Sequence, residues 1–181
     1  MRKLKGFTLI ELLVVIAIIS VLMAILLPSL NRIHEQGKRA ACQNRIKQLA
    51  LAWNIYSDEN DHNIVNANTN EDPYTEDGIP WVIWAEEGST EEDKIEGLHA
   101  GALYPYCAVD KLFKCPTGKR GEIVTYAIVD YLNGHDEISG STLAPLKKRT
   151  QIRNTSRQIV FLDEGRLSPS SWTIYYYHER W

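Results

Sequence analysis

The stretch KGFTLIE at residues 5–11 lies where a short basic leader meets a long apolar segment. The leader, residues 1–6, carries three basic side chains and no acid, a charge that favours the cytoplasmic side of a membrane. From Phe7 to Leu27 almost every side chain is apolar, and a helix of this length, roughly 30 Å, spans a bilayer. The small residue Gly6 precedes the apolar run, so cleavage there would leave the anchor in the mature protein.

Glu11 places a carboxylate inside this predicted transmembrane helix. Such a group costs about 2.5 to 3.5 kcal/mol on insertion scales, and it usually has a partner. Cleavage after Gly6 would create an α-amine on Phe7, one helical turn away, which could neutralise Glu11 within one chain or between neighbouring chains. The pairing between chains would specify a stagger, so we expect Glu11 to set the register of a helical assembly.

Residues 6–11, with Lys5 before them and the apolar run behind, resemble the class III signal of type IV prepilins and type II secretion pseudopilins. The resemblance implies that prepilin peptidase cuts after Gly6 and N-methylates Phe7, and that Glu11 acts in assembly. It also implies that Pro28 permits local melting of the helix during filament packing, which agrees with the hydrogen bond that a proline removes. The implied partners are this peptidase/N-methyltransferase, copies of the chain and other pseudopilins in a helical filament, and an inner-membrane assembly platform.

The sequence predicts four segments: a cleaved leader at 1–6, a transmembrane and assembly helix at 7–29, its amphipathic continuation at 30–57, and an extracytoplasmic head at 58–181. In the continuation, one face is apolar at spacings of three and four residues and the opposite face is polar. The apolar stripe comprises Cys42, Ile46, Leu49, Trp53 and Tyr56, and the polar face comprises Arg39, Asn44, Arg45, Lys47 and Gln48.

The sequence of the head predicts a mixture of loop, helix and strand. Residues 58–80 are rich in Asn, Gly and Pro and predict a loop, and Ser89 with Glu92 predicts a capping box that opens a short helix ending before Pro105. Strands are predicted at 123–129, 159–163 and 172–177. The predicted fold class is α+β and pilin-like: a long N-terminal helix packed on a small antiparallel β-sheet head. The aromatic run at 172–181 is either a buried strand or an exposed adhesive surface.

Charge and motifs limit the classes of function that the chain can have. The formal net charge is −3, and it becomes −6 once residues 1–6 are removed, so nucleic acid is not expected as the main partner. Residues 58–93 hold 12 acids and no Lys or Arg, whereas residues 94–157 hold 10 basic residues and 6 acids. This polarity could guide head-to-tail contacts, or the acidic stretch could be a solvated loop. No phosphate-binding loop, nucleophile elbow or zinc-type histidine motif is present, so we expect no enzyme.

Metal binding and disulfides are the remaining candidates for chemistry. Calcium could be held by oxygens of Asp58 and Asp61 or of Asp72 and Asp77, but neither pair has the spacing of a calcium loop, so no cofactor is expected. In an oxidising compartment, the three cysteines permit three pairings for one bridge. A bridge from Cys107 to Cys115 would close a short loop, one from Cys42 to Cys115 would tie the long helix to the head, and all three thiols could also stay free.

A second resemblance concerns the helix that begins at Cys42 and the segment 112–116, LFKCP. Together they resemble a broad group of pseudopilin-like proteins with a Cys-x-Asn-x-x-Lys-Gln helix, and this likeness implies the Cys42 to Cys115 pairing. Those proteins often continue into an Arg-His and an Asp-Gly-His stretch that this chain lacks after Trp181, which implies that the last strands are missing or supplied differently.

The function expected from the sequence is that of a structural subunit of a pilus-like filament, a type II secretion pseudopilin. A type IV pilin or minor pilin is the alternative within the family. A membrane-anchored extracytoplasmic binding module that never polymerises is the alternative from another class. In each case the chain is expected to cross the inner membrane once, with its head in the periplasm.

Overall fold

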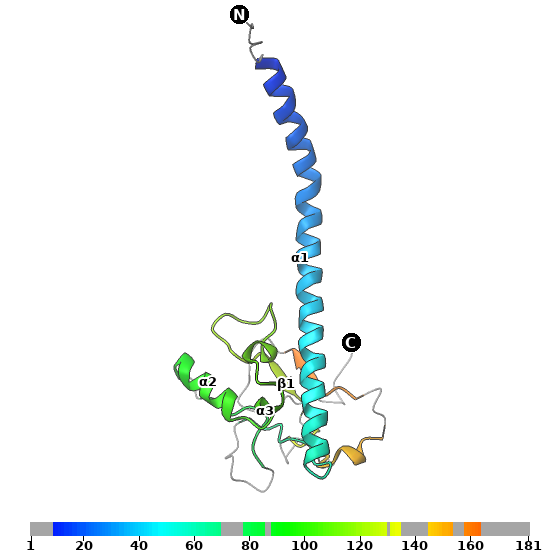
Figure 1. The fold of residues 1–181 in the computed structure, drawn as a ribbon, viewed down its shortest axis with the longest axis vertical. Coiled ribbons are helices and arrows are strands. Elements are labelled where there is room, and N and C mark those ends of the chain that lie inside the picture. The colour runs from blue at the N-terminus through cyan, green and yellow to red at the C-terminus, as the bar shows by residue number, and fades with distance from the viewer. Residues whose placement is uncertain are drawn as a thin grey trace, which may run out of the picture. The chain divides into compact units, whose positions relative to one another are not determined.

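A computed structural model of the 181-residue chain describes residues 9–69, 78–85, 88–129, 131–134, 145–153 and 158–163. The chain divides into two compact units, Met1–Ala40 and Ala41–Trp181. A long N-terminal apolar helix is followed by short helices and a small antiparallel sheet (Figure 1). The predicted α+β, pilin-like fold class is therefore confirmed.

Helix α1 runs unbroken from Leu9 to Glu59 and passes through Pro28. Proline has no backbone N–H, so one carbonyl in the preceding turn loses its helical donor. Immediately after it, the Ser29 hydroxyl donates a 2.7 Å hydrogen bond to the carbonyl oxygen of Leu26. The Ser20 hydroxyl donates a 2.7 Å hydrogen bond to the carbonyl oxygen of Ile16, so the hydroxyls of Ser20 and Ser29 are both satisfied within the helix.

The second half of α1 packs into the head along the predicted apolar stripe. Leu49 and Trp53 are buried, and the other stripe residues are partly buried against the same core. This part of the prediction is confirmed. The polar face differs at Arg45, which is half-buried and donates a hydrogen bond to the carbonyl of Lys114, so the head also covers part of that face.

The head contains α2 (Glu91–Ala100), α3 (Tyr104–Cys107), the 3-10 helices η1 (Asp110–Phe113) and η2 (Arg149–Gln151), and strands β1 (Tyr126–Ile128) and β2 (Phe161–Asp163). The two strands pair antiparallel, with Ala127 opposite Leu162. Both lie inside segments predicted as strands, although each has only three paired residues. The third predicted strand, 172–177, and the rest of the aromatic run lie outside the described residues.

The N-terminus of α2 corrects one prediction. The capping residue is Thr90 and not Ser89, because Thr90 forms a reciprocal capping box with Asp93: its hydroxyl accepts the Asp93 N–H at 3.2 Å, and the Asp93 carboxylate accepts the Thr90 N–H at 2.8 Å. The Thr90 hydroxyl also donates to the Asp93 carboxylate at 2.8 Å, and this bond together with the one from the Thr90 N–H holds the pKa of the Asp93 carboxyl below its usual range. The shorter aspartate therefore fills the third helical position, which the sequence had assigned to Glu92.

The described part of the segment that follows α1 is irregular, as its composition predicts, and it holds only turns, a bend and isolated β-bridges. Residues 64–67 of this loop are nevertheless all buried. Asparagine side chains replace strand partners there: Asn133 donates to the Ile64 carbonyl at 2.8 Å, and Asn66 donates to the Gly78 carbonyl at 3.2 Å. Amide side chains that satisfy the backbone allow an irregular segment to enter the core.

The core of the head centres on Trp81, which is fully buried. Its indole stacks on Phe113, with ring centroids 6.2 Å apart, and meets Phe161 edge-on at 5.6 Å. Helix α2 approaches the backbone beside it so closely that a Cβ on Gly97 or Gly101 would lie 2.4 Å from a carbonyl oxygen of residues 81–83. These glycines allow a helix to pack directly on backbone.

Candidate functional site

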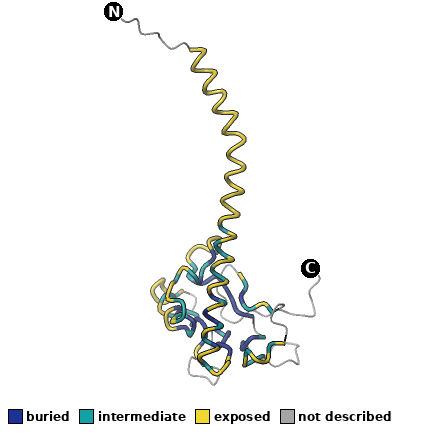
Figure 2. The backbone as a smooth tube through the Cα atoms, turned by 45° about the vertical axis from the view of Figure 1, so that its right-hand side comes forward, coloured by how far each residue is buried: buried dark blue, intermediate teal, exposed yellow. Residues whose placement is uncertain are grey.

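The first half of α1 carries a continuous apolar surface, which we call the assembly segment, residues 9–33. Its large apolar side chains are all exposed, from Leu9 at 80% to Ile33 at 63% (Figure 2). An 18-residue window of α1 has a mean hydropathy of 3.1, and α1 is the one helix among the described residues that is long and apolar enough to cross a membrane. A soluble protein would not leave such a surface uncovered, so this segment requires lipid or other apolar helices around it.

Glu11 lies in the first turn of α1. The first four N–H groups of a helix have no intrahelical acceptor, and the positive end of the helix dipole favours a carboxylate there. Gly6 and Phe7, the predicted cleavage and methylation residues, lie outside the described residues. The pairing of Glu11 with a Phe7 amine therefore stays a prediction.

Two charged side chains just after the assembly segment form an ion pair on the surface of α1. Lys38 donates a 2.9 Å hydrogen bond to Glu35, one turn earlier on the same face, and this contact holds the pKa of the Glu35 carboxyl below its usual range. Glu35 is exposed and Lys38 is partly exposed, as expected for a helix that has left an apolar environment.

Two of the three cysteines lie together in the head. The sulfurs of Cys42 on α1 and Cys115 after η1, together with a carboxylate oxygen of Asp163 on β2, all lie within 4.8 Å of one another. Both thiols are free. The Cys42 thiol donates to Asp163 at 3.5 Å and accepts from the Tyr126 hydroxyl at 3.2 Å. Burial raises the pKa of Cys42 to about 12, and burial with the Cys42 contact raises the pKa of Tyr126.

Cys107 lies apart from this cluster. Its thiol donates to the carbonyl of Leu103 within the α3 turn at 3.2 Å, and burial raises its pKa to about 11. The sequence named all three cysteines as disulfide candidates. It placed Asp163 at the end of a predicted strand, and no local pattern links this residue to a cysteine 121 positions earlier.

The two described calcium candidates have different surroundings. Asp58 pairs with the Arg149 guanidinium and has His62 at 3.9 Å. Asp61 is exposed in a left-handed turn with φ of 52°. Asp72 and Asp77 lie outside the described residues. Within the part of the chain that the structure describes, the group of His, Cys, Asp and Glu side chains that converges is the cysteine and Asp163 cluster.

A second polar cluster ties α2 to η1. Asp110 accepts a 3.0 Å hydrogen bond from the His99 ring and a 2.9 Å bond from the Tyr104 hydroxyl, and the two donors hold the pKa of the Asp110 carboxyl below its usual range. The rings of His99 and Tyr104 also stack, with centroids 4.2 Å apart. Each of the three side chains therefore has its partners within the cluster, and these contacts hold α2 and η1 together at the surface of the head.

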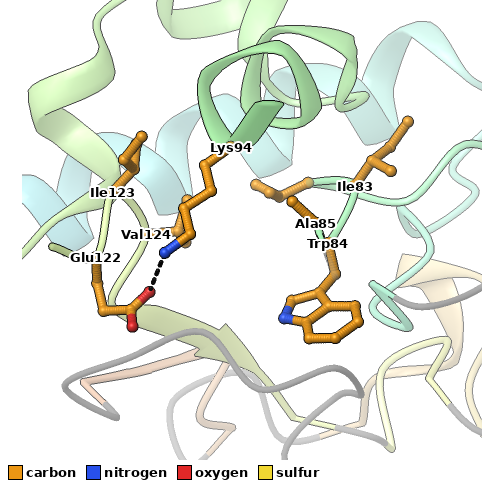
Figure 3. Close-up of a pocket in the computed structure, with 8 residues that line it drawn as sticks. Ile83, Trp84, Ala85, Lys94, Glu122, Ile123 and Val124 are labelled. Atoms are coloured by element: carbon orange, nitrogen blue, oxygen red, sulfur yellow. Dashed lines mark ion pairs between the residues drawn. The ribbon is translucent and has the colours of Figure 1, made fainter. Parts of the chain in front are cut away.

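The head also has a small hollow between α2 and the chain before β1. Lys94 and Glu122 form a 3.7 Å ion pair at its rim, opposite the Trp84 side chain (Figure 3). The hollow measures about 30 Å³. Substrate pockets are usually larger by about tenfold or more, so this one has room for an ordered water and not for a small-molecule substrate.

Comparison with known proteins bears on the N-terminal segment. Residues 1–27 match the family model described as the prokaryotic N-terminal methylation motif. No curated protein and no solved structure matches the chain. The matched residues include the basic leader, the Gly6 and Phe7 junction, Glu11 and the whole apolar run up to Leu27. The chain therefore carries at its N-terminus the class III signal that is typical of type IV prepilins and pseudopilins.

Proposed function

We propose that the chain is a structural subunit of a pilus-like filament, of the type II secretion pseudopilin kind, which is cut after Gly6 and polymerised through its N-terminal helix. One observation carries the proposal: the methylation motif, residues 1–27, includes the start of a helix whose large apolar side chains are exposed from Leu9 to Ile33. In the membrane, lipid would cover this surface. In a filament, the same surface would pack against other copies of the helix.

Glu11 supplies the specificity that apolar packing lacks. Apolar helices can slide along one another with little change in buried area, whereas a carboxylate surrounded by apolar side chains is stable only beside a positive partner. In the proposed filament that partner is the α-amine of Phe7 on a neighbouring subunit. The head would be extracytoplasmic, because the basic leader stays on the cytoplasmic side.

The head supports a structural role better than a chemical one. The small hollow near Lys94 is too small for a substrate, and the polar cluster around Asp110 is engaged in contacts between its own side chains. The head is joined to α1 by the stripe around Leu49 and Trp53, so a force applied to the helix would reach the head through a packed core. This packing suits a filament subunit whose head is displaced when its N-terminal helix is pulled.

Charge removal at Glu11 tests the proposal. We expect Glu11→Gln to leave the chain in the membrane with a folded head, and to reduce the filaments recovered by shearing or crosslinking at least tenfold. Glu35→Gln is the matched control, because it makes the same change further along α1 at an exposed residue, and it should assemble like the wild type. Filaments of Glu11→Gln as abundant as those of the wild type would refute the register role, and a wild-type chain that stays monomeric in the membrane would favour the anchored binding module.

A further inference from the structure

The placement of the three thiols separates them into a pair and a single residue. The Cys42 and Cys115 sulfurs lie within 4.8 Å of each other, although the residues are 73 positions apart in the sequence. Cys107 is bonded to its own turn through Leu103 and does not belong to that group. The fold therefore distinguishes among the three pairings that the sequence leaves open.

The backbone on both sides of the pair is fixed by other contacts. Cys42 is part of the long helix α1. The Cys115 N–H donates a 2.6 Å bond to the Thr125 hydroxyl just before β1, and the adjacent Lys114 carbonyl accepts from Arg45 of α1. A disulfide requires the sulfurs to approach to about 2.05 Å, so they need to move by no more than roughly 3 Å in total.

We propose that Cys42 and Cys115 form a disulfide in the mature subunit, which fastens α1 to the head, and that Cys107 stays a thiol. The two S–H bonds break and one S–S bond forms, and the two protons and two electrons pass to a disulfide-bearing oxidant of the extracytoplasmic compartment, which becomes a dithiol. The choice of compartment rests on the proposed function. The choice of partner rests on the geometry of the head.

The position of this bond gives it a mechanical role in the proposed filament. Cys42 is the first residue of the apolar stripe, only two residues after the boundary at Ala40 between the two compact units. A force that pulls on the assembly segment enters the head at this end of the stripe. Without a covalent bond, such a force would break the apolar contacts of Ile46 and Leu49 one after another. A disulfide at Cys42 would distribute the force over all contacts of the stripe at once.

Peptide mapping of the full chain tests the pairing. Cells are quenched with an alkylating reagent, and the chain is extracted and digested without reductant. We expect one linked peptide pair containing Cys42 and Cys115, with Cys107 alkylated. Cys42→Ser and Cys115→Ser should each remove the linked pair, and the matched control Cys107→Ser should retain it. A link that includes Cys107 would overturn the proposal.

A second arm separates this inference from the proposed function. The purified, reduced full chain is incubated with oxidised glutathione, which supplies the oxidant. Failure to form the Cys42 to Cys115 link in vitro overturns the pairing. If the link forms in vitro but both thiols are reduced in the cell, the disulfide of the mature subunit and the extracytoplasmic location are both contradicted. One zinc ion per reduced chain in the cell extract, lost on Asp163→Asn, would replace the disulfide with a metal site.

Discussion

Gly101 provides a direct test of how α2 packs on the head. Gly101→Ala would place a Cβ 2.4 Å from the Trp81 carbonyl oxygen, 2.7 Å from the Val82 Cα and 2.9 Å from the Trp81 carbonyl carbon. These are backbone atoms, so rotation of a side chain cannot relieve the contact. The backbone of Gly101 has φ of −67° and ψ of 146°, a conformation open to every residue, and the penalty is therefore steric.

The size of this penalty follows from what must move. Shifting α2 away from residues 81–83 would stretch the 3.1 Å bond from the Ile83 N–H to the Gly97 carbonyl and the 2.8 Å bond from the Ala102 N–H to the Pro80 carbonyl. Overpacking of a core typically costs 1 to 3 kcal/mol, and we expect about 3 kcal/mol here because the obstacle is backbone. For a domain of this size, such a loss lowers Tm by roughly 6 to 12 °C.

The assay is urea unfolding of the full chain in detergent, followed by the fluorescence of the buried Trp53 and Trp81. Gly37→Ala is the matched control, because a Cβ at this helical position meets nothing within 4 Å, and it should leave unfolding of the head unchanged. A Gly101→Ala chain whose unfolding free energy stays within about 0.5 kcal/mol of the wild type would refute the close packing of α2.

Three further predictions concern the head. In the reduced chain, the pKa of the Cys42 thiol is 9.0 when the chain is unfolded and about 12 when it is folded. Unfolding between these pH values therefore releases a proton, and the free energy of unfolding should fall as the pH rises above 9. Urea midpoints at pH 8 and pH 10.5 measure this loss. Arg149→Met removes the bonds of 3.3 and 3.0 Å to Asn54 near the end of α1, and we expect a loss of about 1 to 2 kcal/mol by urea unfolding. Thr90→Ala removes the capping box with Asp93 and should cost about 1 kcal/mol in the same assay.

Each of these predictions has a control in the chain. Cys42→Ser should weaken the loss of stability above pH 9, and an equally steep loss in that variant would rule out this thiol as a cause. Arg153→Met, at an exposed residue near Arg149, should be neutral; equal effects of the two changes would mean that the contacts with α1 contribute nothing. Ser89→Ala should leave stability unchanged, and a larger effect there than at Thr90 would restore the cap that the sequence indicated.

Local patterns predicted the parts of the fold that depend on nearby residues. The spacing of Leu49 and Trp53 with their stripe neighbours was sufficient to place the buried face of α1, because helical periodicity is set within a few turns. The positions of β1 and β2 were also indicated, but not their short length, which depends on the partner available across the sheet. The cap of α2 was displaced by one residue because Ser89 and Thr90 both offer a suitable hydroxyl.

Features built from distant segments were not predictable in the same way. The burial of Ile64 depends on the side chain of Asn133, which supplies a hydrogen bond from almost seventy residues away. The meeting of Cys115 with Asp163 depends on how β2 pairs with β1, and no local pattern links the two residues. By contrast, the N-terminal signal was readable from the sequence, because charge, apolar length and Glu11 are all local properties of residues 1–27.

The intact mass of the chain extracted from its native membrane tests whether the N-terminal signal is processed at Gly6. We expect a mature protein that begins at Phe7, lacks residues 1–6 and carries one methyl group on its new N-terminus. A chain that retains its leader in the membrane would contradict this expectation. Cleavage after the apolar run would contradict it equally, because the helix that is proposed to assemble the filament would be lost.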